Sequence, residues 1–285
     1  MICLREAAYA KVNLTLDVLG RRSDGYHDLC SVMQAISLCD DVELHLDTGK
    51  PWEICCGRED IPNDERNLAW RAAKEFFNAA GSEPDGLSIR ITKRIPSQAG
   101  LGGGSADAAA VLRALNRWKD CPLSEYELCD LGAKVGSDVP FCVLGGTALA
   151  EGRGEKLTKL PDAPEMIFVV CKPELAFSTP ELFRRLDETA VSERPETEKM
   201  CHALRRGDLR EIGKLLCNVF EQAVIPDYPE IACIKSVMLE QGACGCVMTG
   251  SGSAVYGIFD KLESARAACA ELEDGSCSVY IGKTV

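Results

Sequence analysis

Hydrophobic residues at every second position predict half-buried strands in this chain. Between residues 11 and 18 the even positions are apolar, so Lys11 and Asn13 lie side by side on the polar face of a strand. The same alternation at residues 42–46 and 87–91 predicts two further strands. The strand over 87–91 leads directly into a glycine-rich loop.

Apolar residues three or four positions apart predict helices between the strands. One runs from Asn67 to Ala80 and ends at Gly81, and another begins at Ser124 and ends at Gly136. Further helices are expected over residues 106–115, 179–187, 192–225, 229–242 and from 264, and further strands over 139–150, 166–171, 244–248, 254–259 and 276–281. The mixed order predicts an α+β fold in two lobes, with a boundary at the charged, glycine-rich residues 151–156.

Composition and charge exclude several classes of protein. The chain has 285 residues, of which 46% are hydrophobic and 27% charged, as in folded globular proteins. Its net charge of −12 argues against nucleic acid or a membrane surface as a partner, because both are polyanions. The first residues lack a basic segment followed by a long apolar one, so a cytoplasmic location is expected.

The sixteen cysteines are numerous, but their spacing does not indicate a metal site. No CxxC pair occurs and the chain has only three histidines, which argues against a zinc site or a disulfide framework. Most thiols are expected to be buried as small hydrophobic groups. Cys244 and Cys246 form a CxC pair, for which alternation along a strand is the favoured interpretation over metal binding.

The glycine-rich loop is the main candidate for ligand binding. Gly100 and Gly102–Gly104 fall within five positions, so the backbone can approach a ligand closely. Ser105 is a good N-cap, and a helix is expected from Ala106. Backbone N–H groups and the positive end of the helix dipole would then attract an anion. This arrangement favours a phosphate site over a turn that only packs a strand against a helix.

The familiar phosphate-binding and hydrolase motifs do not fit. No Gly-Lys pair is set in a Walker A motif, and the loop is not part of an amino-terminal βαβ unit of the Rossmann type. The HRD and DFG motifs of protein kinases and the GxSxG elbow of serine hydrolases are also absent from the sequence.

Three motifs in the same order resemble those of the GHMP kinases. Residues Pro96–Ala106 read PSQAGLGGGSA and resemble the signature PxxxGLGGGS/A-A of that family. Ala8–Leu14 (AYAKVNL) and Met248–Ala254 (MTGSGSA) resemble its amino- and carboxy-terminal motifs. The resemblance implies a two-lobed fold with the active site in the cleft between lobes and ATP as phosphoryl donor. It also implies an ATP-binding and catalytic domain over 1–155 and a substrate-binding domain over 156–285.

Two more segments are similar to one group within that family. Leu19–Leu29 (LGRRSDGYHDL) and Gly136–Phe141 (GSDVPF) resemble segments of the members that act on a cytidine diphosphate conjugate of methylerythritol. This implies phosphorylation of the 2-hydroxyl of the methylerythritol unit, on the non-mevalonate route to isoprenoid precursors. The alternatives are a kinase for a small alcohol such as homoserine or mevalonate, and a catalytically silent nucleotide-binding module.

The resemblance implies two catalytic residues whose chemistry is complementary. Asp138 would remove or orient the proton of the acceptor hydroxyl, and Lys11 would stabilise charge on the migrating phosphoryl group. Without the resemblance, Asp138 is equally well explained as a turn residue and Lys11 as a solvated charge.

The remaining site residues are also carried over from the family. The resemblance implies that ATP contacts Asn67, Lys93, Pro96, Gly100, Leu101, Gly102, Gly103, Gly104, Ser105 and Ala106, and that the acceptor contacts Asn13, Tyr26, His27, Asp138, Phe183, Thr249 and Gly250. Mg²⁺ is expected, and Ser105 either contacts it or only caps the helix. Asn67 has the alternative of a plain N-cap, and Thr249 with Gly250 that of a hairpin turn.

Aromatic side chains are the candidates for binding the cytosine. The face of Tyr26 can stack on a base, and the ring nitrogens of His27 can bond its edge. Phe183 matches the position that supplies the other face of the base in the resembled enzymes, with helix core as the alternative. A base site of this kind argues against a small acyclic alcohol as acceptor.

Overall fold

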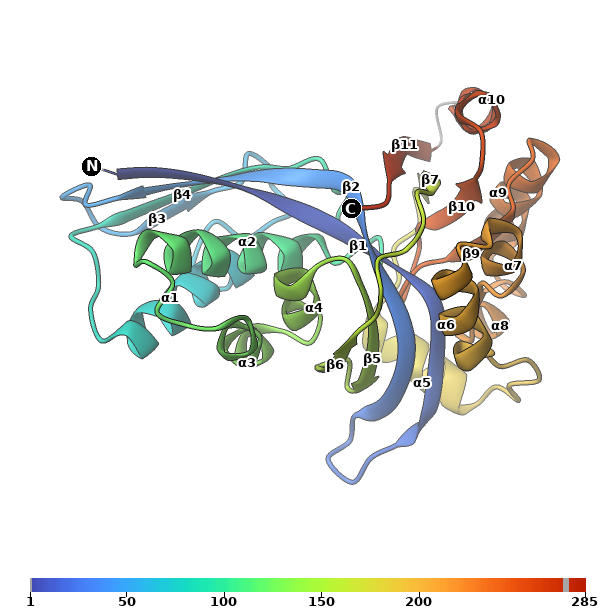
Figure 1. Ribbon diagram of the computed structural model, residues 1–285, viewed down its shortest axis with the longest axis horizontal. Coiled ribbons are helices and arrows are strands. Elements are labelled where there is room, and N and C mark those ends of the chain that lie inside the picture. Colours follow the sequence, from blue (N-terminus) through green and yellow to red (C-terminus); the bar gives the residue numbers. More distant parts are fainter. Residues whose placement is uncertain (1, 274–276) are drawn as a thin grey trace. The chain divides into compact units, whose positions relative to one another are not determined.

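The computed structural model describes residues 2–273 and 277–285. Residue contacts divide the chain into two compact units, which are presented separately (Figure 1). The first unit comprises the residues up to Ala10, Cys39–Ser97 and Gly102–Gly145, and the second comprises Lys11–Leu38, Gln98–Leu101 and Gly146–Val285. The long strands β1 (Ile2–Arg21) and β2 (His27–Leu46) each contribute residues to both units.

These units differ from the predicted division at residue 155. The chain enters and leaves each unit several times, and residues 11–38 and 98–101 group with the carboxy-terminal half. The assignment of ATP binding to residues 1–155 and of acceptor binding to 156–285 stays a prediction.

In the first unit the strand order is β3 (Glu53–Cys55), β4 (Leu87–Thr92), β2 and β1. Strand β4 runs antiparallel to β2, with Ile89 opposite Leu44, and β3 runs parallel to β4. Both of these side chains are fully buried, so this face of the sheet forms the core. The strand predicted over 87–91 is confirmed.

Four helices belong to the first unit: α1 (Leu68–Ala80), α2 (Gly103–Trp118), α3 (Glu125–Val135) and α4 (Val139–Leu144). Helices α1–α3 lie along one side of its sheet (Figure 1). Two helices follow their predicted caps. Asn67 Oδ1 accepts a hydrogen bond of 2.9 Å from Ala69 N, and Ser124 forms a capping box with Glu127.

Helix α2 begins earlier than predicted. Ser105 is not its N-cap: the helix starts at Gly103, and Gly102 takes the cap position with φ of 69°. Glycine adopts this left-handed conformation without steric cost, so the turn into the helix is made inside the glycine run. Ser105 therefore lies in the first helical turn.

The strand predicted over residues 139–150 is wrong in its first half. Residues 139–144 form α4, and only Thr147–Gly152 form a strand, β5. The run VPFCVL is apolar at every position, so periodicity cannot separate a buried strand from a buried helix. Pro140 suits the first turn of a helix, and Gly145 and Gly146, with φ of 66° and 61°, end it.

The second unit contains two sets of strands. β5 pairs antiparallel with β2 and with β6 (Lys156–Lys159), and β8 (Cys217–Asn218) pairs parallel with β1. A separate antiparallel sheet has the order β11 (Cys277–Lys283), β7 (Ile167–Pro173), β10 (Val255–Phe259) and β9 (Gly245–Met248). The last four strands were expected, although Ser276, the predicted start of the final strand, lies outside the described residues.

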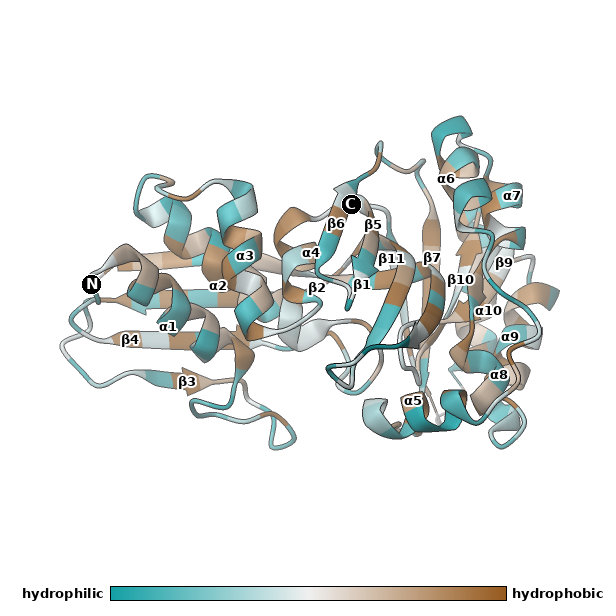
Figure 2. Cartoon of the chain, turned by 90° about the horizontal axis from the view of Figure 1, so that it is seen from below, coloured by the Kyte–Doolittle hydropathy of each residue, from teal (hydrophilic) through white to brown (hydrophobic). Residues whose placement is uncertain are grey.

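The described residues of the second unit form six helices: α5 (Thr179–Asp187), α6 (Thr197–Arg206), α7 (Leu209–Lys214), α8 (Phe220–Val224), α9 (Pro229–Glu240) and α10 (Leu262–Leu272). Figure 2 shows hydrophobic residues along β7 and β10 and many hydrophilic residues on α5 and α6. Buried side chains of α5, α8, α9 and α10 pack with the sheet in one core that includes Phe220, Met238, Met248 and Phe259. The helical prediction for 192–225 is confirmed only in part: residues 192–196 are not helical, and the rest is divided into α6, α7 and α8 with β8 between the last two.

Both faces of β1 are buried over residues 11–18, so the prediction of a half-buried strand is wrong there. The polar side chains of this stretch are satisfied by other polar groups rather than by water. Val32 N donates to Thr15 Oγ1 at 3.0 Å, and Arg194 Nη1 donates to Asp17 Oδ1 at 2.6 Å.

Among the residues that the structure describes, no helix combines the length and the apolar character needed to span a bilayer.

Candidate active site

The start of α2 in the first unit has the properties of an anion site. The N–H groups of Gly103, Gly104 and Ser105 belong to the first turn, where a helix has no internal acceptor for them. Ala106 N donates to Gly102 O at 2.8 Å, so its N–H is used within the helix, and its contact with ATP stays a prediction. Gly104 is exposed. The expected helix end is therefore present and is built by the glycines, and its binding of an anion stays a prediction.

The first unit also brings the Asp138 segment to this helix end. A Cβ on Gly136 would lie 3.8 Å from Leu68 Cδ1 and 3.9 Å from Ser105 Oγ, and a Cβ on Gly104 would lie 3.5 Å from the same leucine atom. Asp138 occupies the N-cap position of α4, but its side chain accepts no cap hydrogen bond there. Asp138 lies in the turn that precedes α4, as its alternative interpretation requires, and its catalytic role stays a prediction.

Lys93 is bound between two buried carboxylates. Its Nζ donates to Asp40 Oδ2 at 2.5 Å and to Asp107 Oδ2 at 2.6 Å, and its side chain is 3% exposed. Asp40 Oδ1 accepts from the backbone N atoms of Arg94 and Ile95 at 2.5 and 2.8 Å. This group ties the end of β4 to the first turns of α2, where a Cβ on Gly103 would come 3.5 Å from Lys93 Nζ.

One ammonium group, that of Lys93, faces two carboxylates, those of Asp40 and Asp107, so the charges of this group do not balance. Burial raises the pKa of Asp107 to about 7, although the lysine opposes the shift. Burial alone would lower the pKa of Lys93, but the two carboxylates together raise it. Asp107 Oδ1 is buried and has no hydrogen-bond partner. A shared proton on the carboxylates would satisfy both the charge and that oxygen.

Both carboxylates hold the ammonium group of Lys93, which gives this residue a structural task, and its contact with ATP stays a prediction. Sequence reasoning did not find Asp40 or Asp107. The available signal was weak: Asp107 is an acidic residue in an alanine-rich helix, at a position surrounded by apolar neighbours. Asn67 likewise uses its side chain as a cap and as a donor to Pro62 O at 2.8 Å, and its contact with ATP stays a prediction.

In the second unit Lys11 is buried, so its interpretation as a solvated charge is wrong. The residue is 3% exposed, and its Nζ donates to Asn13 Oδ1 at 2.8 Å. Its backbone N donates to Leu101 O at 3.0 Å, which attaches the strand to the glycine-rich loop. Burying a lysine is costly, so its ammonium group must be held by polar partners.

Asn13 is held in one orientation by its neighbours. Its Nδ2 donates to Ser31 Oγ at 2.8 Å and its backbone N to Thr249 Oγ1 at 3.2 Å. The hydroxyl of Tyr256 donates to Asn13 O at 2.8 Å. Because the amide nitrogen faces the serine, the amide oxygen is presented to Lys11.

Two glycines allow the loop and the 249–250 turn to pack against each other. Gly100 has φ of 74°, and a Cβ there would lie 2.1 Å from Thr249 O. Gly250 has φ of 55°, and a Cβ there would lie 2.9 Å from Gly100 O and 3.2 Å from Lys11 Nζ. Thr249 and Gly250 follow β9 and precede β10, so they form the expected turn and also lie beside Lys11.

The sequence did not identify Asn218, whose side chain is hydrogen-bonded to this turn. It is 2% exposed, and its Nδ2 donates to Met248 O at 2.7 Å and to Gly250 O at 2.8 Å. Its Oδ1 accepts from Phe220 N at 3.0 Å. The sequence placed Asn218 inside a helical stretch, and only the parallel pairing of β8 with β1 shows where it lies.

The predicted cytosine-binding rings are only partly brought together. His27 stacks on Phe183, with ring centroids 4.6 Å apart and an angle of 17° between the planes. His27 Nε2 lies 2.9 Å from Asp187 Oδ1, and Phe183 also packs edge-on against Phe220. Tyr26 is 55% exposed and lies beside Arg153 instead, with 5.0 Å between the guanidinium carbon and the ring centroid.

Two sequence models of one family match the chain. Residues 67–146 match the sequence model of the GHMP kinases N terminal domain, and residues 200–275 match that of the GHMP kinases C terminal. The first range contains the glycine-rich loop and Asp138. Together the two ranges cover more than half of the chain, so it belongs to the GHMP kinase family.

Two relatives with high sequence identity to this chain carry the same name. The chain is 47% identical over 262 residues to the 4-diphosphocytidyl-2-C-methyl-D-erythritol kinase of Caldicellulosiruptor saccharolyticus, covering 92% of this chain and 90% of the relative. It is 42% identical over 277 residues to the enzyme of that name from Pelotomaculum thermopropionicum, covering 97% and 96%.

Solved structures agree with this placement. A crystal structure of 4-(cytidine 5'-diphospho)-2C-methyl-D-erythritol kinase has a TM-score of 0.82 at 34% identity, over 98% of both chains. Homoserine kinase from Cytophaga hutchinsonii has a TM-score of 0.78 at 20% identity, over 99% of this chain and 94% of the other, which shows the shared fold alone.

Proposed function

We propose that this chain transfers the γ-phosphoryl group of ATP to the 2-hydroxyl of 4-diphosphocytidyl-2-C-methyl-D-erythritol, on the non-mevalonate route to isoprenoid precursors. The observation that carries the proposal is the similarity to relatives named for this kinase, at 40–47% identity over at least nine-tenths of the chain. The acidic composition supports a cytoplasmic enzyme with small-molecule substrates.

We propose that the triphosphate of ATP binds at the start of α2. The N–H groups of Gly103, Gly104 and Ser105 point out of the helix end, where the dipole favours negative charge. Mg²⁺ fits the hydroxyl of Ser105, because hydroxyl and carboxylate oxygens are hard ligands and the Asp138 segment lies close by. When bound, the ion would neutralise charge on the phosphates.

Asp138 and Lys11 are proposed to have complementary roles in the transfer. Asp138 orients the hydroxyl and takes its proton as the new O–P bond forms. Lys11, fixed by the oriented amide of Asn13, stabilises the negative charge of the phosphoryl oxygens. We further propose that the cytosine binds at the stack of His27 on Phe183, with Tyr26 as an additional ring.

The first test measures ADP release from ATP with three acceptor conditions: the cytidine conjugate, methylerythritol phosphate and no acceptor. Turnover with the conjugate alone is the expected result. Equal turnover with homoserine or mevalonate would favour a small-alcohol kinase, and no turnover with any acceptor would favour a silent nucleotide-binding protein.

A second test concerns Asp138, with Asp130 as the matched control in the preceding helix. Asp138→Asn should lower kcat by at least about 100-fold, because the amide cannot take the proton, while the affinity for ATP changes little. Asp130→Asn should leave both unchanged. Full activity of Asp138→Asn would remove this residue from the mechanism.

A further inference from the structure

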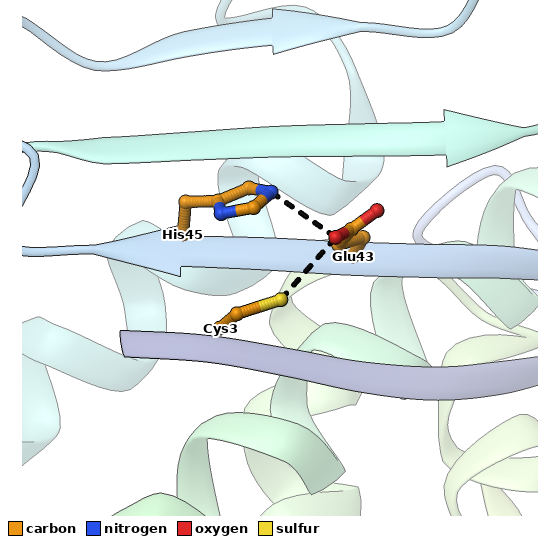
Figure 3. Close-up of side chains that lie close together, drawn as sticks. All are labelled: Cys3, Glu43 and His45. Carbon is orange, nitrogen blue, oxygen red and sulfur yellow. Dashed lines mark hydrogen bonds and ion pairs between the residues drawn. The ribbon is translucent and has the colours of Figure 1, made fainter. Parts of the chain in front are cut away.

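A cysteine, a glutamate and a histidine meet on the sheet of the first unit, apart from every residue used above. Cys3 comes from β1, and Glu43 and His45 come from β2 (Figure 3). Their ligand atoms all lie within 4.8 Å of one another. Glu43 and His45 are two residues apart on one strand, so they share a face. Leu44 between them enters the core, so the cluster is on the opposite face of the sheet.

Two of the three distances between the ligand atoms are close to those of a metal centre. Cys3 Sγ lies 3.2 Å from Glu43 Oε1, and His45 Nε2 lies 3.3 Å from the same oxygen. Ligands at about 2.0–2.3 Å from a tetrahedral zinc ion are about 3.3–3.6 Å apart. The three side chains therefore need only small adjustments to share one ion.

His45 gives an independent indication of a missing partner. Its Nε2 is buried, yet it makes no hydrogen bond, because its approach to Glu43 lacks hydrogen-bond geometry. Among the described residues, only one other buried side-chain polar atom lacks a hydrogen-bond partner: Asp107 Oδ1. An imidazole nitrogen that is buried, unsatisfied and directed at a thiol and a carboxylate is suited to a metal ion.

We propose that Cys3, Glu43 and His45 form a site for a divalent transition-metal ion, with Zn²⁺ as the favoured occupant and water as the fourth ligand. A thiolate and an imidazole select zinc or cobalt over magnesium or calcium, which prefer oxygen ligands. The ion would link the first residues of β1 to the end of β2. This site is separate from the Mg²⁺ proposed for catalysis.

Arg5 competes with a metal for the carboxylate. Its Nη2 lies 3.3 Å from Glu43 Oε1. The side chain of Arg5 is 80% exposed, so it can leave into water when an ion arrives. Removing this guanidinium should therefore strengthen metal binding.

The test is titration of the reduced, chelator-treated full-length protein with Co²⁺, followed by displacement with Zn²⁺. Wild type should show one equivalent of tetrahedral cobalt with a thiolate-to-cobalt absorption band. Cys3→Ser should lose that band and bind at least about tenfold more weakly, as expected when a metal ligand is lost. Arg5→Ala should bind more tightly than wild type.

Matched controls separate this site from the other thiols and histidines. Cys121→Ser and His202→Ala change exposed residues outside the cluster and should bind Co²⁺ as wild type does. Cys3 is itself exposed, so Cys3→Ser should fold, and its unfolding curve without metal checks this. An unchanged cobalt spectrum in Cys3→Ser, or an equal loss in Cys121→Ser, would overturn the proposal. ATP-dependent turnover should not change in Cys3→Ser, whichever way the proposed function is decided.

Discussion

Lys11 and Lys93 are both buried lysines beside a glycine, and the groups to which their ammonium nitrogens donate differ. Lys93 donates to two carboxylates, and its side chain is 3% exposed. Lys11 donates to the neutral amide of Asn13 and lies beside the turn at Gly250. The charge of Lys93 is therefore balanced by carboxylates within the fold. The comparison teaches that a buried lysine near a phosphate loop is not by itself a catalytic residue.

The largest expected effect concerns Lys11. Lys11→Met keeps the length of the side chain and removes its charge, so kcat should fall by about 100-fold to 1000-fold, as when one group that stabilises the transition state is lost. Binding of ATP and the free energy of unfolding should change much less. Steady-state kinetics, nucleotide titration and urea unfolding measure the three quantities. An active Lys11→Met would end the contrast with Lys93.

Lys93→Met should show the opposite pattern. It leaves the carboxylates of Asp40 and Asp107 buried without their cation, which should lower the free energy of unfolding by about 3–5 kcal/mol. Adding Asp107→Asn to this variant removes one of the two charges and should restore part of the loss. Urea unfolding of the single and double variants measures this. Unchanged stability in Lys93→Met would show that the group does not act as a structural tie.

The comparison extends to the glycine beside each lysine, which is Gly250 for Lys11 and Gly103 for Lys93. Gly250 has φ of 55°, and a Cβ would meet Gly100 O at 2.9 Å. Gly250→Ala should therefore cost at least about 1–2 kcal/mol from the left-handed backbone alone. Gly103 begins a helix without a left-handed φ, and its Cβ would lie 3.0 Å from Ile95 Cγ2 and 3.5 Å from Lys93 Nζ, both side-chain atoms, so Gly103→Ala should cost less than Gly250→Ala. Thermal unfolding of the two variants checks the order.

Much of the fold could be predicted because its signals are local. The helix from Asn67 to Gly81 has both of its caps in the sequence, and the strand over 87–91 alternates cleanly. The strand prediction for residues 139–144 was wrong because a run that is apolar at every position has no period to detect.

The candidate site was predictable in its motifs but not in its contacts. The glycine loop and Lys11 could be recognised, whereas the pairing of Lys93 with Asp40 joins residues 53 positions apart and leaves no local pattern. Asn218 was missed for the same reason, since its role depends on a two-residue strand that pairs with β1. Burial of polar residues is decided by such distant partners, which a single sequence does not display.

The stabilising contribution of the Lys93 group is predicted to depend on pH. The pKa of Asp107 is raised to about 7 in the folded chain, above its ordinary value of 3.8. The folded state then binds a proton more tightly than the unfolded state, so this group's stabilising contribution is complete below about pH 4 and is lost as the pH rises to about 7. One proton limits the slope to about 1.4 kcal/mol per pH unit. Asp107→Asn mimics the protonated acid, so the variant should gain stability relative to wild type as the pH rises from 5 to 7 and hold that gain above it. Urea unfolding across this range measures the difference, and a constant difference would mean that Asp107 stays ionised beside Lys93.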